Sequence, residues 1–186
     1  MSHSTLPTLL SGGHKGAEAE FGRAAKRWGL AQSTLSCEGH DMEWPVSVRV
    51  LSDDELAKGD VSMEIVSRRM GRSYHHPGRI RRVVQSIFHM VNEAHQVFVI
   101  GWIQSDDTVK GGTGWAVELA KLFNRDLYVF DQARHGWFAW RGGRWEPTEP
   151  RLGERWFCGT GTRNLTDEGR AAVTQLFEQS LGPAPA

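Results

Sequence analysis

Three glycine-rich turns, each between an apolar segment and a helical pattern, constrain the fold of this chain more than any other feature. The first follows the apolar run 6–10, the second lies at 111–114, and the third lies at 159–163. A strand that leads through a glycine turn into a helix is the repeating unit of parallel α/β sheets. The turns therefore predict an α/β fold whose ligands bind beyond the carboxyl ends of the strands.

The rest of the chain fits this pattern of alternating strands and helices. Apolar spacings of three to four predict helices, and the continuous apolar run 97–100 predicts a central strand that is covered on both faces. A further strand is expected at 155–158, and segment 136–145 alternates around Gly142-Gly143 as β-hairpins do. We therefore predict one Rossmann-like domain over residues 1–186, with a mostly parallel sheet, helices on both faces and a small β-hairpin.

Charge and composition restrict the class of function. The 186 residues contain 22 basic and 22 acidic side chains, and this balance argues against nucleic-acid or membrane binding through bulk charge. No apolar run approaches the roughly 20 residues that span a bilayer. The first ten residues have neither the basic region nor the apolar length of a signal peptide, so we expect a cytoplasmic protein.

The cysteines and most histidines point to no metal chemistry. Cys37 and Cys158 belong to no CxxC motif or Cys/His cluster, so we predict no zinc site and two buried, reduced thiols. His75-His76 precedes Pro77 in a polar segment, which we interpret as a solvated loop. The sequence names no cofactor.

The glycine turns carry the chemistry that the sequence suggests. A glycine turn lets the backbone approach an anion, and the first N–H groups of the next helix add about 0.3–1 kcal/mol per favourable charge. Lys15 and Arg163 can neutralise a phosphate directly, and Trp102 follows the central strand, where it can stack on a ring. The predicted ligand-binding residues are Gly12, Gly13, His14, Lys15, Gly16, Trp102, Gly111, Gly112, Thr113, Gly114, Gly161, Thr162 and Arg163.

None of the turns is a Walker A loop or a clean GxGxxG motif. The alternative interpretation is that the glycines only make tight connections between strand and helix. Three such turns opening on one edge of a sheet favour the binding interpretation, provided that the fold brings them together.

Segments 111–114, 11–18 and 161–163 resemble motifs of one superfamily. Segment 111–114 with Glu118 resembles a PGGxGT motif followed by a glutamate, segment 11–18 resembles SGGxxGAD, and segment 161–163 resembles a GxR turn. These motifs are similar to those of the SLOG superfamily. That group includes the LONELY GUY phosphoribohydrolases, the molybdenum cofactor carrier proteins and the Rossmann domain of DNA-processing protein A.

The order of the motifs differs from that of the DNA-processing branch. There the GxR turn precedes the SGG turn, whereas here the SGG turn is near the N-terminus and the GxR turn follows the last predicted strand. The chain therefore resembles a circular permutation of that branch, which folds tolerate when the termini lie at the surface.

The resemblance implies a Rossmann-like protein that binds a phosphate-bearing nucleotide or a nucleotide-like ligand, as a carrier, sensor or binding protein. An alternative is a phosphoribohydrolase or other N-glycosidic hydrolase that uses Glu118 as its acid/base. The arginine that this activity needs is not where the family places it, because 86–87 reads Ser-Ile. A third possibility is a regulatory subunit that docks through the hairpin 136–145. We also expect a homo-oligomer.

Overall fold

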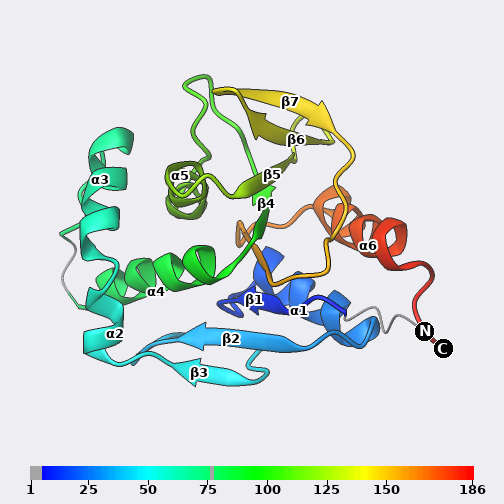
Figure 1. Ribbon diagram of the computed structural model, residues 1–186, viewed down its shortest axis with the longest axis horizontal. Helices are drawn as coiled ribbons and strands as arrows, with labels where there is room; N and C mark the ends of the chain where they lie inside the picture. The colour runs from blue at the N-terminus through cyan, green and yellow to red at the C-terminus, as the bar shows by residue number, and fades with distance from the viewer. Residues whose placement is uncertain (1–5, 76–77) are drawn as a thin grey trace.

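An eight-stranded sheet runs through residues 6–75 and 78–186, the part of the chain that the computed structural model describes (Figure 1). The strands are β1 (Leu9–Ser11), β2 (Gln32–Ser36), β3 (Val48–Val50), β4 (Gln96–Gly101), β5 (Asp126–Asp131), β6 (Gly136–Arg141), β7 (Arg144–Thr148) and β8 (Phe157–Gly161). Their order is β3-β2-β1-β8-β4-β5-β6-β7. The first six of these run parallel, and the hairpin β6–β7 adds an antiparallel edge.

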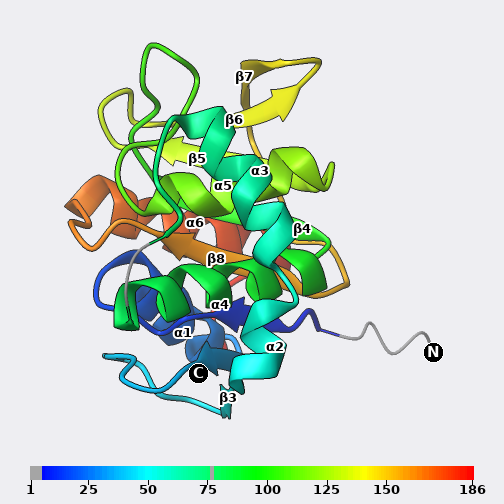
Figure 2. The same ribbon diagram turned by 90° about the vertical axis from the view of Figure 1, so that its left-hand side faces the viewer.

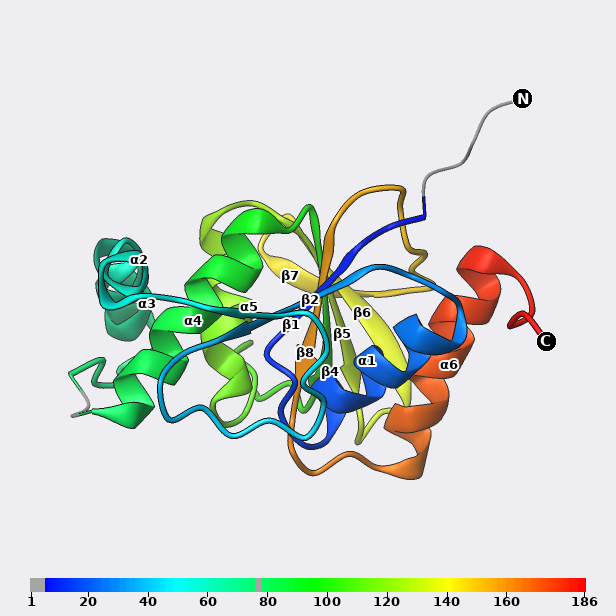
Figure 3. The ribbon, with the colours of Figure 1, turned by 90° about the horizontal axis from the view of Figure 1, so that it is seen from below.

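Helices cover both faces of the sheet, as Figure 3 shows along its edge. The helices are α1 (Ala17–Arg27), α2 (Asp53–Ala57), α3 (Asp60–Met70), α4 (Arg79–Glu93), α5 (Thr113–Leu122) and α6 (Asp167–Leu181). α1 and α6 pack on one face, and α4 and α5 pack on the other. α3 packs against α4 and α5 on the outside of this second layer (Figure 2).

Local sequence signals explain several of these boundaries. Ser52 and Glu55 form the capping box that starts α2, and the Thr166 side chain caps α6 by accepting a hydrogen bond from the Gly169 amide. Gly142 and Gly143 both have positive φ, of 59° and 78°, which suits a two-residue hairpin turn between β6 and β7. The predicted α/β class with a mostly parallel sheet is therefore confirmed.

The third glycine segment lies differently from its prediction. Residues 159–161 were expected in a turn after a strand at 155–158, but they form the end of β8, and the turn begins at Thr162. A Cβ at Gly159 would lie 2.5 Å from Cγ of Phe21, and one at Gly161 would lie 2.3 Å from the carbonyl oxygen of Ile100. Both glycines therefore serve close packing inside the sheet.

β8 lies at the point where the order in which the strands follow one another across the sheet reverses. β1 continues through α1 to β2 on one side, and β4 continues through α5 to β5 on the other. β8 pairs in parallel with both β1 and β4, as predicted for the last parallel strand. The crevice beyond the carboxyl ends of these three strands is where open α/β sheets bind ligands.

Among the helices of the described residues, none combines the length and apolarity needed to cross a membrane.

Removal of residues 154–186 should abolish the fold. β1 and β4 would lose the strand between them, and α6 would no longer cover the core residues Phe98 and Phe130. We expect no cooperative unfolding transition in this chain by circular dichroism, whereas removal of 183–186 alone should leave the transition intact. A truncated chain that melts cooperatively near the native temperature would show that β8 and α6 are an appendage.

Candidate functional site

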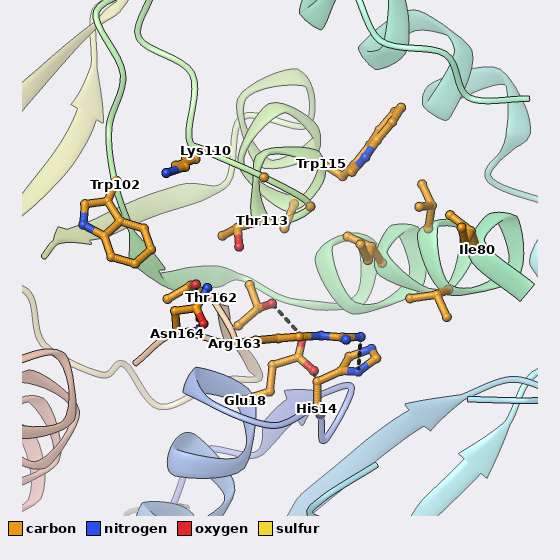
Figure 4. A pocket seen from close by; sticks show the side chains of 18 of the residues that line it. His14, Glu18, Ile80, Trp102, Lys110, Thr113, Trp115, Thr162, Arg163 and Asn164 are labelled. Carbon is orange, nitrogen blue, oxygen red and sulfur yellow. Dashed lines mark hydrogen bonds between the residues drawn. The ribbon is translucent and has the colours of Figure 1, made fainter. Parts of the chain in front are cut away.

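A cavity of about 800 Å³ lies at the carboxyl ends of β1, β8 and β4 (Figure 4). Its walls come from both helical layers and from the loops between them. The lining residues are His14, Glu18, Arg79, Ile80, Val83, Val84, Ile87, Trp102, Lys110, Gly111, Gly112, Thr113, Trp115, Ala116, Thr160, Gly161, Thr162, Arg163 and Asn164.

All three glycine segments contribute to this one cavity. The first provides His14, the second provides residues 111–113, and the third provides residues 161–163. Five predicted binding residues lie outside the lining, namely Gly12, Gly13, Lys15, Gly16 and Gly114. The structure thus brings the three segments together but presents only part of each to the cavity.

Two backbone amides of the first turn are already occupied within the chain. The amide of His14 donates to Oε2 of Glu18 at 3.0 Å, and the amide of Gly13 donates to the Ser11 hydroxyl at 3.2 Å. A Cβ at Gly12 would lie 2.7 Å from the same Glu18 oxygen. The glycine therefore makes room for a carboxylate of the chain itself, and this turn offers the cavity the His14 imidazole rather than free N–H groups.

Glu18 is a buried carboxyl at the base of the cavity, with 4% of its surface exposed. Its Oε1 accepts a hydrogen bond of 2.7 Å from the Thr160 hydroxyl of β8. Burial raises the pKa of Glu18, and the hydrogen bonds from Thr160 and the His14 amide oppose this rise. Glu18 joins α1 to β8 directly beneath the site.

Gly16 allows the segment after β8 to pass close to the start of α1. A Cβ at Gly16 would lie 2.5 Å from the carbonyl oxygen of Thr162, which accepts a hydrogen bond of 3.0 Å from the Ala17 amide. Because this contact fixes the backbone at Thr162, it also fixes the start of the Arg163 side chain. Figure 4 shows Arg163 extended above Glu18 with its guanidinium beside His14.

A chain of hydrogen bonds runs from Arg163 to β2. Nη2 of Arg163 lies 3.5 Å from Nδ1 of His14, and Nε2 of His14 lies 2.7 Å from Nε2 of His40. Nδ1 of His40 lies 3.0 Å from the Ser36 hydroxyl. Since a guanidinium can only donate, Nδ1 of His14 is an acceptor, so its Nε2 carries the proton and donates to His40.

Both imidazoles are held neutral. Burial, followed by the positive charge of Arg163, lowers the pKa of His14 to about 4. Burial and the neighbouring His14 lower the pKa of His40 to about 4. The pair therefore carries no charge near neutral pH in the ligand-free protein.

The second glycine segment leaves space at the start of α5. Gly111 has a φ of 75°, and no described atom beyond its chain neighbours lies within 4 Å of the Cβ position at Gly111 or Gly112. Gly114 differs, because a Cβ there would lie 2.6 Å from the carbonyl oxygen of Val109. Gly114 serves packing, whereas Gly111 and Gly112 face open space at a helix N-terminus.

The remaining walls divide into a cationic part and an apolar part. Arg79, Lys110 and Arg163 are the lining residues with full positive charges, and the Lys110 amine lies 5.8 Å from the centre of the Trp102 ring. The apolar part is formed by Trp115, Ala116 and the face of α4 that carries Ile80, Val83, Val84 and Ile87. The cavity therefore combines a cationic wall with an apolar wall.

Glu118, the predicted acid/base, lies outside this cavity. Its carboxylate is 6% exposed and binds the Lys121 amine at 2.8 Å. That amine also donates to the Asp107 carbonyl and lies 4.0 Å from the centre of the Trp140 ring. Glu118 thus belongs to a contact that ties the hairpin β6–β7 to the loop carrying Trp102.

The sequence analysis missed several residues of the site. Glu18 stood within the SGG-like segment, but its spacing gave no sign that it would bind its own turn. Arg79 stood in a basic cluster whose orientation depends on how α4 packs. His40 follows β2 in a segment with no periodic pattern, so only the parallel pairing of β1 and β2 places it beside His14.

The solvated loop expected around His75-His76 lies only partly within the residues that the structure describes. His75 is exposed and lies 2.6 Å from the Glu64 carboxylate, while His76 and Pro77 lie outside the described residues. In the described part of the chain, His, Cys, Asp and Glu form no group of three that could hold a metal ion.

Comparisons with known proteins find a likeness in fold. No protein-family model matches the chain, and neither does any curated protein sequence. A crystal structure described as "Putative molybdenum carrier protein", from Syntrophus aciditrophicus SB, superposes with a TM-score of 0.55 at 12% sequence identity. The match covers 95% of this chain and 96% of that one, so the two share their overall fold.

The histidine pair should make stability depend on pH. Both residues titrate near 4 when folded and near their ordinary value of 6.5 when unfolded. The unfolded chain therefore binds more protons between these values, and the free energy of unfolding falls as the pH drops from about 6.5 to about 4. Glu18, whose pKa is raised, acts with the opposite sign.

Urea unfolding of the native protein and His40→Gln at about pH 7 and about pH 5 tests this effect, because Glu18 is common to both. We expect the variant to lose clearly less stability between the two conditions. Equal losses would contradict the buried neutral pair.

Proposed function

We propose that this protein binds a small phosphate-bearing, nucleotide-like ligand in the cavity between β1, β8 and β4, as a carrier or binding protein. The observation that carries the proposal is that Arg79, Lys110 and Arg163 line one cavity together with the N-terminus of α5. A helix N-terminus and three cations around one space form a site for a multiply charged anion.

The position of the phosphate follows from the open space at Gly111 and Gly112. The Gly114 and Trp115 amides donate to the carbonyls of Gly111 and Gly112, which leaves the Thr113 amide for an anion, and the absence of side chains at Gly111 and Gly112 lets the anion approach it. Thr113 adds a hydroxyl on the same side (Figure 4). Lys110 and Arg163 border this space and supply charge-assisted hydrogen bonds.

The rest of the ligand meets aromatic and aliphatic groups. Trp102 lies on one side of the Lys110–Thr113 segment in Figure 4, and Trp115 and, on α4, Ile80 lie on the other. These surfaces suit the flat ring of a base or a pterin-like group. A site with one cationic part and one apolar wall distinguishes such a ligand from free phosphate.

The neighbour in fold supports a carrier more than an enzyme. That neighbour is described as a "Putative molybdenum carrier protein", and it matches this chain over nearly the full length of both. The motif resemblance adds the proposal that the chain belongs to the SLOG superfamily, as a circular permutation of the DNA-processing branch. The hydrolase alternative loses its predicted acid/base, since Glu118 is bound to Lys121 outside the cavity.

Binding of adenosine 5′-monophosphate, measured by isothermal titration calorimetry, tests the proposal. Arg163→Gln should weaken binding by about 10-fold or more, because one charge-assisted contact to phosphate is worth roughly 1.5–3 kcal/mol. The matched control is Arg141→Gln, since Arg141 is exposed on the hairpin and does not line the cavity. Equal affinities in the two variants, or no binding by the native protein, would contradict the proposal.

Gly112→Val provides a second test that separates binding from folding. A valine at this position fills the space proposed for the phosphate, whereas it meets no described atom of the fold within 4 Å at its Cβ. We expect a large loss of affinity with a melting temperature close to that of the native protein. Gly161→Val should instead unfold the chain, because its Cβ would overlap the Ile100 carbonyl. Normal binding by Gly112→Val would place the ligand elsewhere.

A further inference from the structure

We propose that His14 and His40 form a proton-accepting pair that takes up one proton when a dianionic group binds beside Arg163. The pair thereby selects a dianion over a neutral ligand and couples the binding to pH. This inference rests on the proposed function, because it requires an anion at Arg163.

The hydrogen bonds fix which nitrogen can accept that proton. His14 donates from Nε2 to Nε2 of His40 at 2.7 Å, and His40 donates from Nδ1 to the Ser36 hydroxyl at 3.0 Å. Both nitrogens of His40 and Nε2 of His14 are therefore engaged. Nδ1 of His14 remains, with its lone pair directed toward Arg163 on the cavity side.

An anion beside Arg163 changes the role of this nitrogen. The lone pair of Nδ1 and the oxygens of a phosphate are both acceptors, so they cannot form a hydrogen bond without an additional proton. When the Arg163 guanidinium pairs with the anion, it ceases to donate to Nδ1. Proton uptake at Nδ1 then converts an acceptor that repels the phosphate into a cationic donor that binds it.

The charges around the pair favour this change when a dianion arrives. Arg163, from the loop after β8, and Arg79, from the start of α4, disfavour protonation in the ligand-free protein. Asp41, from the loop after β2, favours it for both histidines, and Glu18, from α1, favours it for His40. A dianion offsets the two arginines and leaves the carboxylates in place.

The shift that a bound dianion causes is large enough to bring the pKa of His14 into the physiological range. An opposite charge within about 4–6 Å shifts a pKa by about 1–3, and a dianion supplies two such charges. Starting from a pKa of about 4 for His14, the bound form should titrate near neutrality. A neutral ligand supplies no such charge and should bind without proton uptake.

Calorimetry with adenosine 5′-monophosphate at about pH 6.5, in two buffers of different ionisation enthalpy, counts the protons taken up on binding. We expect the native protein to take up about half a proton or more beyond the value for His14→Gln. The matched control, His95→Gln, should behave as the native protein, because His95 is exposed at the other end of β4. Adenosine, which lacks the phosphate, should show no uptake.

The imidazole nitrogen resonances of the native protein give a second readout that requires no variant. In the free protein, His14 should be the Nε2–H tautomer and His40 the Nδ1–H tautomer, and the nucleotide should convert His14 to an imidazolium. A His14 that stays neutral in the complex, or equal proton uptake by native protein and His14→Gln, would overturn the proton-accepting pair alone. Failure of the native protein to bind the nucleotide would overturn the proposed function and this inference together.

Discussion

The insertion of β8 between β1 and β4 is the constraint on which the rest of the structure depends. The sheet extends from β8 through β1 and β2 on one side and through β4 and β5 on the other, and without β8 these two halves would not be joined. The close fit requires Gly159 beneath Phe21 and Gly161 against the Ile100 backbone. The same insertion carries residues 162–164 into the centre of the crevice, where they become part of the cavity. The strand that joins β1 to β4 therefore also leads directly into the wall of the cavity.

The buried Glu18 holds two walls of the cavity together through hydrogen bonds within the chain. Its carboxylate binds both the first glycine turn and Thr160 of β8, which joins the beginning of the chain to its end. Glu18 thereby occupies the His14 amide, one of the N–H groups that a glycine turn would otherwise offer to an anion. The first glycine turn therefore supplies the His14 imidazole to the cavity, and the start of α5 supplies residues 111–113.

The fold was largely predictable from the sequence because its signals are local. Apolar runs and helical spacings predicted the strands and helices, and the Gly142-Gly143 pair placed the hairpin. The error at 159–161 arose because glycine marks both a turn and a strand position under close packing. Only the position of the Phe21 ring over β8 distinguishes the two cases.

The site was predictable only in part, because it depends on packing between distant segments. His14, Trp102 and Arg163 could be found from their places beside the glycines. His40 and Arg79 could not, because the packing of β2 and α4 decides where they lie. Glu118 shows the opposite case, since its motif spacing suggested a role in the site, whereas its side chain binds Lys121 and does not line the cavity.

The central claim is that one anionic, ring-bearing ligand occupies the cavity beside Arg163. Mass spectrometry of small molecules released by denaturing the purified protein tests it most directly, with Arg163→Gln purified in parallel. The account predicts a phosphorylated, ring-containing compound that is released in a fixed ratio from the native protein and is strongly depleted from the variant. A compound without an anionic group, or equal amounts from both proteins, would contradict it.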